Sequence, residues 1–380
     1  MSTILLTILG TGLVLLVAYD VYATILHARA RSGPIGESLN RIVWRSMRVV
    51  AFRLPRQRRH RVLNAVGPLL LPSLIIIYLL LLVSGFALVF YPRMPEQFAV
   101  APDAMSSPAV AAIYFSGITL TTVGYGDITP HTTLMRMVAL VESASGFALI
   151  SLAVTYLITV YSALERKRAV ALSFYHQAEE GADVAGFIAH HFVLGRFYGL
   201  EATLRLATRD IQGLLESHVE HPVIHYFHPV EVYKSLPRML FLLLETSSVI
   251  RSCLDEQEYK EIYYHPEVRN LEQSAHHVLF ELDASLRLER RRSRRSETHY
   301  EESRRWAGRY RATMRRLADA GIKTRPDEKE GLEEYRARRE EWESKLHRFS
   351  VYLGYDWDET TGDRDLRYAA DEEMEAPLKG

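Results

Sequence analysis

The chain has 380 residues, enough for two or three domains. It carries 46 basic and 46 acidic residues, so its net charge gives no reason to expect a nucleic-acid partner. The single cysteine, Cys253, excludes an intrachain disulfide and is expected to be a buried structural thiol in a reducing compartment. Residues 1–165 are apolar with short polar interruptions, whereas residues 166–380 are densely charged.

Three segments are long and apolar enough to span a bilayer, whose hydrocarbon core takes about 20 helical residues. They run from Ile4 to Leu26, from Leu69 to Tyr91 and from Leu134 to about Tyr161. The first segment has no basic start and no small-residue cleavage site, so it is better explained as an uncleaved span than as a secretory signal peptide.

The polar segments between the spans predict the orientation, because short basic loops stay on the cytoplasmic side. Residues 92–108 contain one arginine, Arg93, whereas Arg166, Lys167 and Arg168 follow the third span. We therefore expect a plasma-membrane protein with its amino terminus outside and its large carboxyl-terminal region in the cytoplasm. The first loop contains a single acidic residue and ten arginines: Arg29, Arg31, Arg41, Arg45, Arg48, Arg53, Arg56, Arg58, Arg59 and Arg61.

Within that loop, Leu39–Leu54 alternates arginines with apolar residues. Arg41, Arg45 and Arg48 share one helical face, which predicts a basic amphipathic helix in contact with membrane lipids. A voltage-sensor helix also carries spaced arginines. This stretch is too short and too interrupted to cross a bilayer, and the chain lacks the additional spans.

The segment between the second and third spans contains a short helix signal. Ser107 suits the N-cap and Pro108 the first helical position. A helix from Pro108 to about Thr119 would be about 18 Å long. Its carboxyl end would face the middle of the membrane, where its dipole favours a cation.

The sequence Thr122-Val-Gly-Tyr-Gly126 follows this helix. Non-helical backbone at membrane depth persists only where it is buried in protein or lines a polar path. The two glycines allow successive carbonyls to turn the same way, so a ring of chains would stack cages of carbonyl oxygens. Such cages replace the hydration shell of K⁺, with the Thr122 hydroxyl as the innermost ligand. We expect K⁺ ions here and no organic cofactor.

A Thr-Val-Gly-Tyr-Gly-Asp motif after a short helix and between two spans resembles the tetrameric potassium-channel family, over residues 69–165. The resemblance implies a homotetramer, since one motif supplies a quarter of the ring. Ktr-like and Trk-like transporters instead place four degenerate loops in one polypeptide. The residues that would form the selectivity filter are Thr122, Val123, Gly124, Tyr125 and Gly126.

The resemblance also implies roles for residues near the filter. Asp127 corresponds to the acidic residue of the outer mouth, and Tyr114 and Phe115 to an aromatic pair that braces the filter. Gly146 corresponds to a hinge in the inner helix, although close helix packing would also explain a glycine there. Ile118 departs from the family: some bacterial members have a glutamate there that pairs with the outer aspartate. Tyr114 is an alternative partner for Asp127.

Two carboxylates fall within the predicted spans, where ionisable residues are candidates for function. Glu142 lies one turn before Gly146 and could support the filter by hydrogen bonding behind it, or place negative charge near the ion path. Asp20 could reach an arginine of the amphipathic helix. Structural pairing is the simpler interpretation of both.

The second half of the chain is expected to be a helical cytoplasmic domain, residues 166–355, followed by an acidic flexible tail, residues 356–380. Helical patterns cover Glu201–His218, the stretch from Ser235 through Leu244, and Glu328–His347. The Rossmann glycine fingerprint is missing from this half, so the ligand that would regulate it is unknown.

Four histidines cluster in this half: His218, His221, His225 and His228. Imidazoles suit zinc, nickel or copper, and they also titrate near neutral pH. Pro222 and Pro229 interrupt a regular helix, so these histidines need not converge, and ordinary loop histidines are the simpler interpretation.

These observations predict an all-α membrane protein. Its parts would be an N-terminal span (residues 1–27), a basic cytoplasmic loop (28–68), a pore module (69–165), the helical domain and the tail. The predicted function is passive, K⁺-selective conduction by a homotetramer, gated by inner-helix movement coupled to the cytoplasmic domain. The alternatives are a non-conducting scaffold or regulatory subunit, and a component of a potassium transporter. The sequence shows no nucleophile–base constellation, and we expect no enzyme.

Overall fold

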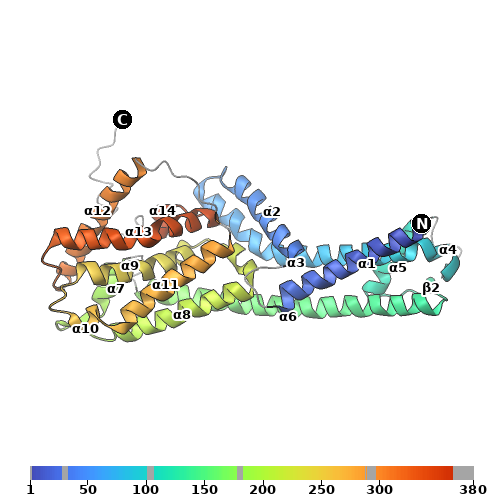
Figure 1. Cartoon of the computed structure of the whole chain (residues 1–380), viewed down its shortest axis with the longest axis horizontal. Coiled ribbons are helices and arrows are strands. Elements are labelled where there is room, and N and C mark those ends of the chain that lie inside the picture. The colour runs from blue at the N-terminus through green and yellow to red at the C-terminus, as the bar shows by residue number, and fades with distance from the viewer. Residues whose placement is uncertain are drawn as a thin grey trace. The chain divides into compact units, whose positions relative to one another are not determined.

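A computed structural model describes residues 2–27, 33–100, 107–177, 183–286, 288 and 297–362. The chain separates into two compact units. The first unit comprises residues 1–50, 65–162 and 219–227, and the second comprises residues 51–64, 163–218 and 228–380. Helices dominate the described residues, with only four short strands among them, which confirms the predicted all-α fold (Figure 1).

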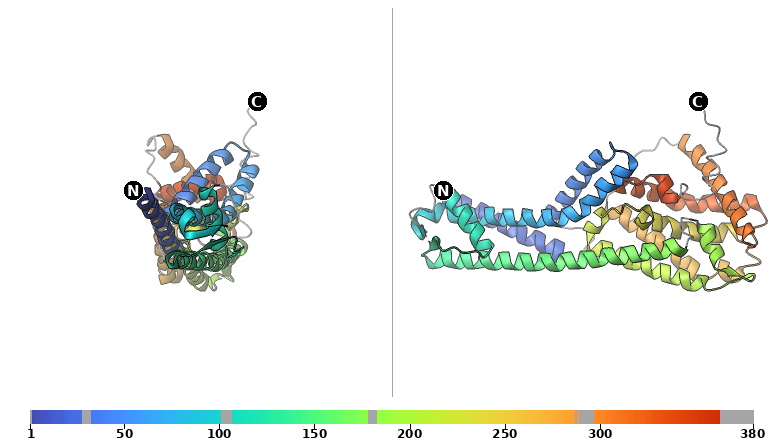
Figure 2. Two further views of the ribbon diagram at one scale, coloured as in Figure 1. Left: turned by 90° about the vertical axis from the view of Figure 1, so that its right-hand side faces the viewer. Right: turned by 180° about the vertical axis from the view of Figure 1, so that it is seen from behind.

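Three helices of the described part are long and apolar enough to cross a membrane: Thr3–Leu26, Arg56–Arg93 and Thr133–Gln177. They coincide with the three predicted spans but two of them extend further. The second begins at Arg56, thirteen residues before the predicted start at Leu69, and the third continues past Arg166. Figure 2 shows α6, which contains the third span, as one unbroken helix.

The first unit contains the following elements: α1 (Ser2–Val21), the π-helix η1 (Tyr22–Leu26), α2 (Pro34–Ala51), α3 (Arg56–Phe90) from residue 65, η2 (Tyr91–Arg93), α4 (Met94–Gln97), β1 (Phe98–Val100), α5 (Pro108–Leu120), β2 (Ile128–Pro130), α6 (Thr133–Gln177) up to residue 162, and η3 (Pro222–Tyr226). Strands β1 and β2 pair antiparallel, with Ala99 opposite Thr129.

Small residues and aromatic rings hold the first unit together. A Cβ atom on Gly10 of α1 would lie 2.4 Å from the Gly85 carbonyl oxygen of α3, so only glycine allows these two helices to approach so closely. The Phe90 ring meets the rings of Phe98 and Phe115 edge to face, at 5.6 and 5.1 Å between centroids. This cluster joins α3, β1 and α5.

The second unit contains the first turns of α3, the end of α6 and the following elements: α7 (Val184–His190), β3 (Phe192–Val193), β4 (Arg196–Phe197), most of α8 (Leu200–Glu220), η4 (Val232–Lys234), α9 (Leu236–Cys253), α10 (Lys260–Tyr263), α11 (Pro266–Ser285), α12 (Glu297–Asp319), α13 (Glu328–Leu353) and α14 (Trp357–Thr361).

Helix α9 forms the core of the second unit. Every residue from Leu236 to Cys253 except Arg251 is buried, and α9 runs beside α11 and α13 (Figure 1). A helix that is covered on all sides can be apolar all round. Ser235 caps its first turn by accepting a hydrogen bond from the Arg238 N–H at 3.3 Å, as its position in the sequence suggests.

One predicted boundary and one predicted cap need correction. The tail does not become irregular at Asp356, because Trp357–Thr361 forms α14, whose residues Glu359, Thr360 and Thr361 are buried. Residues 363–380 of the predicted tail lie outside the described residues. Ser107 has extended backbone angles and precedes α5 as predicted, but its side chain makes no capping hydrogen bond.

Candidate functional site

Helix α5 ends at Leu120 and leads directly into the predicted filter. The backbone from Thr122 to Gly126 alternates in handedness. The φ angles are +61° at Thr122, +57° at Gly124 and +82° at Gly126, whereas Val123 and Tyr125 do not have positive φ. Alternation of this kind turns successive N–H groups to one side and successive carbonyls to the other. Thr122 adopts the left-handed region without being glycine, which is costly for a β-branched residue and therefore characteristic of a functional segment.

The N–H groups of this segment are held by the end of the pore helix. The Val123 and Gly124 N–H groups both donate to the Ile118 carbonyl, at 2.9 and 3.2 Å, and the Thr122 N–H donates to the Thr119 carbonyl at 3.1 Å. These three donors are therefore satisfied within the chain. The side chains of Val123 and Tyr125 are 52% and 73% exposed in the single chain.

Asp127, the residue predicted for the outer mouth, has the partner that was considered for it. The Tyr114 hydroxyl donates to Asp127 Oδ2 at 2.8 Å, and the Ile128 N–H donates to Asp127 Oδ1 at 3.1 Å. The pore helix has Ile118 where a glutamate could have paired with Asp127. Tyr114, on the same helix, is the partner of Asp127 instead. Phe115 plays a different part, since its ring packs into the core with Phe90 and Phe98.

Gly146 lies against the end of the pore helix. A Cβ atom at this position would be 1.9 Å from the Leu120 carbonyl oxygen, so α6 can pass α5 only because residue 146 is glycine. Helix α6 continues without interruption through Gly146. Close packing thus accounts for this glycine, and its use as a hinge stays a prediction.

Glu142 is fully buried behind the pore helix. Its Oε1 contacts the Ser116 hydroxyl of α5, and the same hydroxyl lies 3.0 Å from the Val83 carbonyl oxygen of α3. Its second oxygen, Oε2, has no hydrogen-bond partner among the described residues. Of the two predicted roles, the hydrogen bond behind the filter is the one that this arrangement supports.

Asp20 does not reach an arginine of the amphipathic helix. Its carboxylate accepts hydrogen bonds from the N–H groups of Ile35 (2.7 Å) and Gly36 (3.1 Å) and from the Tyr78 hydroxyl (2.6 Å). It therefore caps the start of α2 from another helix, where exposed N–H groups and the helix dipole favour a negative charge. A Cβ atom on Gly33 would lie 2.4 Å from Asp20 Oδ1, so the chain needs glycine there.

The histidines do not assemble the predicted metal site. In the described part of the chain, no three or more His, Cys, Asp or Glu side chains are grouped as metal ligands would be. His218 Nδ1 lies 2.7 Å from the Leu214 carbonyl oxygen. Both ring nitrogens of His228 are occupied, Nδ1 by the Leu353 carbonyl at 3.0 Å and Nε2 by His60 Nδ1 at 2.8 Å. His228 has no lone pair left for a metal, and His221 and His225 are buried in the first unit.

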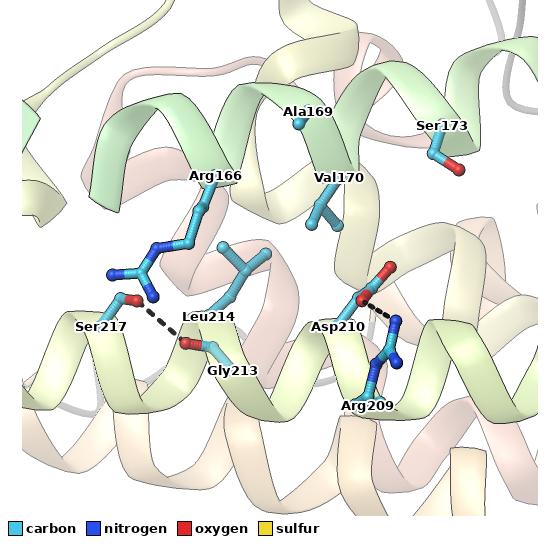
Figure 3. A pocket seen from close by; sticks show the side chains of 9 residues that line it. All are labelled: Arg166, Ala169, Val170, Ser173, Arg209, Asp210, Gly213, Leu214 and Ser217. Atoms are coloured by element: carbon cyan, nitrogen blue, oxygen red, sulfur yellow. Dashed lines mark hydrogen bonds and ion pairs between the residues drawn. The ribbon is translucent and has the colours of Figure 1, made fainter. Parts of the chain in front are cut away.

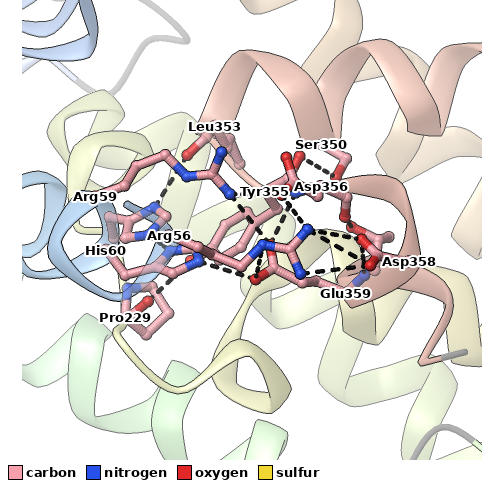
Figure 4. Close-up of polar contacts among 12 residues, drawn as sticks. Arg56, Arg59, His60, Pro229, Ser350, Leu353, Tyr355, Asp356, Asp358 and Glu359 are labelled. Carbon is pink, nitrogen blue, oxygen red and sulfur yellow. Dashed lines mark hydrogen bonds and ion pairs between the residues drawn. The ribbon is translucent and has the colours of Figure 1, made fainter. Parts of the chain in front are cut away.

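His228 instead belongs to a buried polar cluster of the second unit, of which Figure 4 labels His60, Tyr355 and Glu359. His60 Nε2 lies 3.1 Å from Glu359 Oε1, and the rings of His60 and His228 both stack on Tyr355. Because the Leu353 carbonyl can only accept, His228 Nδ1 carries its proton and Nε2 accepts from His60. Burial, and then the neighbouring His60, lower the pKa of His228 well below its usual value, which keeps it in this accepting form.

Arginines complete the same cluster and tie the first turn of α3 to α14. Arg59 Nη2 lies 2.8 Å from Asp356 Oδ2, and Arg56 contacts both Asp356 and Asp358 (Figure 4). Burial alone would raise the pKa of Asp356, but the guanidinium groups of Arg59 and Arg56 outweigh it and lower that pKa. No sequence pattern indicates this cluster, because its members are about 170 and 300 residues apart in the chain.

A cavity of about 470 Å³ lies between α6 and α8 in the second unit (Figure 3). Arg166 and Ser173 line it from α6, and Gly213 and Ser217 line it from α8. Arg209 and Asp210 of α8 also line this cavity, and the Arg209 guanidinium lies 3.6 Å from Asp210 Oδ1. Its volume is that of a small-molecule site.

Comparison with known proteins addresses the pore module. Residues 76–163 match the family described as "Ion channel". This part of the chain is therefore similar to ion-channel domains. The matched segment begins within α3 and ends within α6, so it includes α5, the filter segment and Glu142.

Individual relatives agree with that match. The chain is 29% identical to the uncharacterized membrane protein YdjJ of Bacillus subtilis over 249 residues, which are 65% of this chain and 70% of that protein. It is 35% identical over 74 residues to a putative potassium channel protein of Rhodopseudomonas palustris, covering 20% of this chain and 16% of the relative. It is also 33% identical over 90 residues to the human voltage-gated potassium channel regulatory subunit KCNG1, covering 24% and 17%. No solved structure matches the chain.

Proposed function

We propose that four copies of this chain form a K⁺-selective channel that conducts passively across the plasma membrane. The observation that carries the proposal is the alternating backbone at Thr122, Gly124 and Gly126, which turns a row of carbonyls to one side. Four such rows around an axis would make the stacked oxygen cages that replace the hydration shell of K⁺. Assembly would also cover the exposed side chains of Val123 and Tyr125.

The test is K⁺ and Na⁺ flux into liposomes that contain the purified full-length chain, with its mass in detergent measured in parallel. We expect flux that strongly favours K⁺, and a particle of four chains. In Gly124→Ala a side chain would occupy a left-handed position, at a cost of roughly 1–2 kcal/mol per subunit, so selective flux should be lost. Gly12→Ala is the matched control, because nothing lies within 4 Å of its Cβ position. Normal selective flux through the Gly124 variant would overturn the filter assignment.

The resemblance to a regulatory subunit supports a second candidate, a subunit that keeps the filter fold but does not conduct on its own. The absence of flux from correctly assembled wild-type protein would favour this candidate. Flux that required another chain would favour a transporter component. In either case Gly124→Ala would not change the flux through the purified chain, because the wild-type chain alone would conduct nothing.

We further propose that α2 lies on the cytoplasmic membrane surface. Its exposed side chains include Ile42 (64%) and Val49 (58%), and Arg45 is exposed between them, a combination that suits an interface with anionic lipids. We also propose that the cytoplasmic half binds a regulatory ligand, and the cavity lined by Arg166 is the candidate site for it.

The proposed orientation can be mapped by labelling, since Cys253 is the chain's single cysteine and is buried. In a Cys253→Ala background, an impermeant maleimide added to intact cells should label Ser107→Cys and leave Arg166→Cys unlabelled. The opposite pattern would reverse the orientation.

A further inference from the structure

Ser116 links the three helices of the pore module through one hydroxyl group. It sits on α5, its Oγ lies 3.0 Å from the Val83 carbonyl oxygen of α3, and it contacts Glu142 Oε1 of α6. Ser116 and Glu142 are both fully buried. Outer helix, pore helix and inner helix therefore meet at a single buried oxygen atom.

The number of hydrogens in this contact determines which group donates. A serine hydroxyl has one hydrogen, and a backbone carbonyl can only accept. One hydrogen cannot fully serve both acceptors. If Ser116 donates to the Val83 carbonyl, the hydrogen between Ser116 and Glu142 comes from Glu142. A carboxyl group can donate only while it carries its proton.

The second carboxyl oxygen leads to the same answer. Glu142 Oε2 is buried and has no hydrogen-bond partner among the described residues. An ionised carboxylate in that setting would spread its charge onto an oxygen with nothing to compensate it, at membrane depth. A neutral acid leaves there only a carbonyl-type oxygen, which is far less costly to bury.

We propose that Glu142 is a neutral hydrogen-bond donor and that Ser116 relays its bond to Val83, so that the two act as positioning residues for the selectivity filter. This inference rests on the proposed K⁺-channel function. The effect on the filter passes along α5: Ile118, two residues after Ser116, accepts the N–H groups of Val123 and Gly124. A pore helix fixed at Ser116 therefore fixes the backbone whose carbonyls would bind the ion, without adding charge to the ion path.

The first test compares variants of the full chain in liposomes. Glu142→Gln keeps the shape and supplies an N–H donor, so its K⁺ over Na⁺ permeability ratio should match wild type. Ser116→Ala removes the relay and should lower the ratio roughly tenfold, the effect of about 1.4 kcal/mol. Glu142→Asp keeps the acid but is one methylene shorter, and should behave like Ser116→Ala. Adding Glu142→Gln to Ser116→Ala should cause little further loss, because both act through one contact.

Loss of selectivity in Glu142→Gln would overturn the inference, since it would show that the charge is required. Wild-type selectivity in Ser116→Ala would overturn the relay. If Ser116→Ala or Glu142→Asp fails to assemble, the Glu142→Gln result alone still decides between a neutral and a charged group.

A second readout does not depend on conduction. Infrared difference spectra at neutral pH should show a protonated carboxylic acid band in wild type that is missing in Glu142→Gln. An unchanged spectrum would refute the neutral acid even if the channel conducts. The band together with no K⁺ flux would refute the proposed function while leaving the protonation state of Glu142 established.

Discussion

Replacing Gly146 with alanine tests whether the inner helix must touch the end of the pore helix. The new Cβ would lie 1.9 Å from the Leu120 carbonyl oxygen, whereas real Cβ atoms do not come closer than 3.0 Å to such an atom. The end of α5 or the facing turn of α6 must therefore move by about 1 Å, and such overpacking costs about 1–3 kcal/mol. Alanine would otherwise stabilise the helix by up to about 1 kcal/mol, so a net loss of stability would identify the steric contact as the larger effect.

The functional consequence should be large because Leu120 lies two residues before Thr122. Carbonyl cages hold K⁺ through the positions of their oxygens, so a shift of about 1 Å should lower selectivity as well as the midpoint of thermal unfolding. Both would be measured on purified Gly146→Ala, in liposomes and in detergent respectively. Gly12→Ala is the control, since its Cβ position has no neighbour within 4 Å and that substitution should be neutral or stabilising.

A Gly146→Ala protein with wild-type selectivity and wild-type unfolding midpoint would refute the packing argument. Reduced conduction with unchanged selectivity and midpoint would instead favour the hinge that the family resemblance implies.

Three further predictions concern buried charge. Asp20→Ala should destabilise the protein by about 2–4 kcal/mol, because it removes the cap of α2 and leaves the Tyr78 hydroxyl unpaired; thermal unfolding would show this, and an unchanged midpoint would refute it. Arg339→Met should lower the free energy of unfolding by about 3–5 kcal/mol, because Glu245, 2.7 Å from the guanidinium, would be left as a buried unpaired charge. In denaturant titrations the Glu245→Leu/Arg339→Met double variant should recover much of that loss. Burial lowers the pKa of His228, so the folded state binds its proton less readily than the unfolded chain, whose imidazole titrates near 6.5. The free energy of unfolding should therefore be constant above about pH 7 and fall as the pH drops below about 6.5, less steeply in His228→Asn; identical slopes would contradict this.

The parts of the fold that the sequence predicts well are those with local signals. The three spans, the pore helix starting at Pro108 and the buried run of α9 follow from apolar length and from proline and serine positions. The left-handed backbone at Gly124 and Gly126 follows from glycine chemistry. Thr122 also has positive φ, which its β-branched side chain would not have predicted.

Contacts between distant segments could not be predicted in the same way. The strands β1 and β2 are three residues each, too short to show an alternating pattern. Ser116 is a serine in an apolar helix, and no pattern in the neighbouring sequence indicates that it contacts Glu142. For Asp20, the expected partner was an arginine side chain, whereas the structure offers backbone N–H groups that no sequence pattern displays. In each case the deciding factor is which surfaces the tertiary fold brings together.

The second unit includes Arg56, Arg59 and His60, so it affects where a fragment of this protein can begin and end. These residues precede the pore module in the chain, yet their carboxylate partners, Asp356 and Glu359, lie near its other end. Deleting everything after Arg168 would not release a self-sufficient pore. Arg56, Arg59 and His60, which are at least partly buried among acidic groups, would lose these partners. We expect such a fragment to aggregate. A minimal pore fragment should begin after Asn64 as well as end before Ala163. An experiment that removes only the carboxyl-terminal half measures this damage together with the proposed regulatory effect of that half.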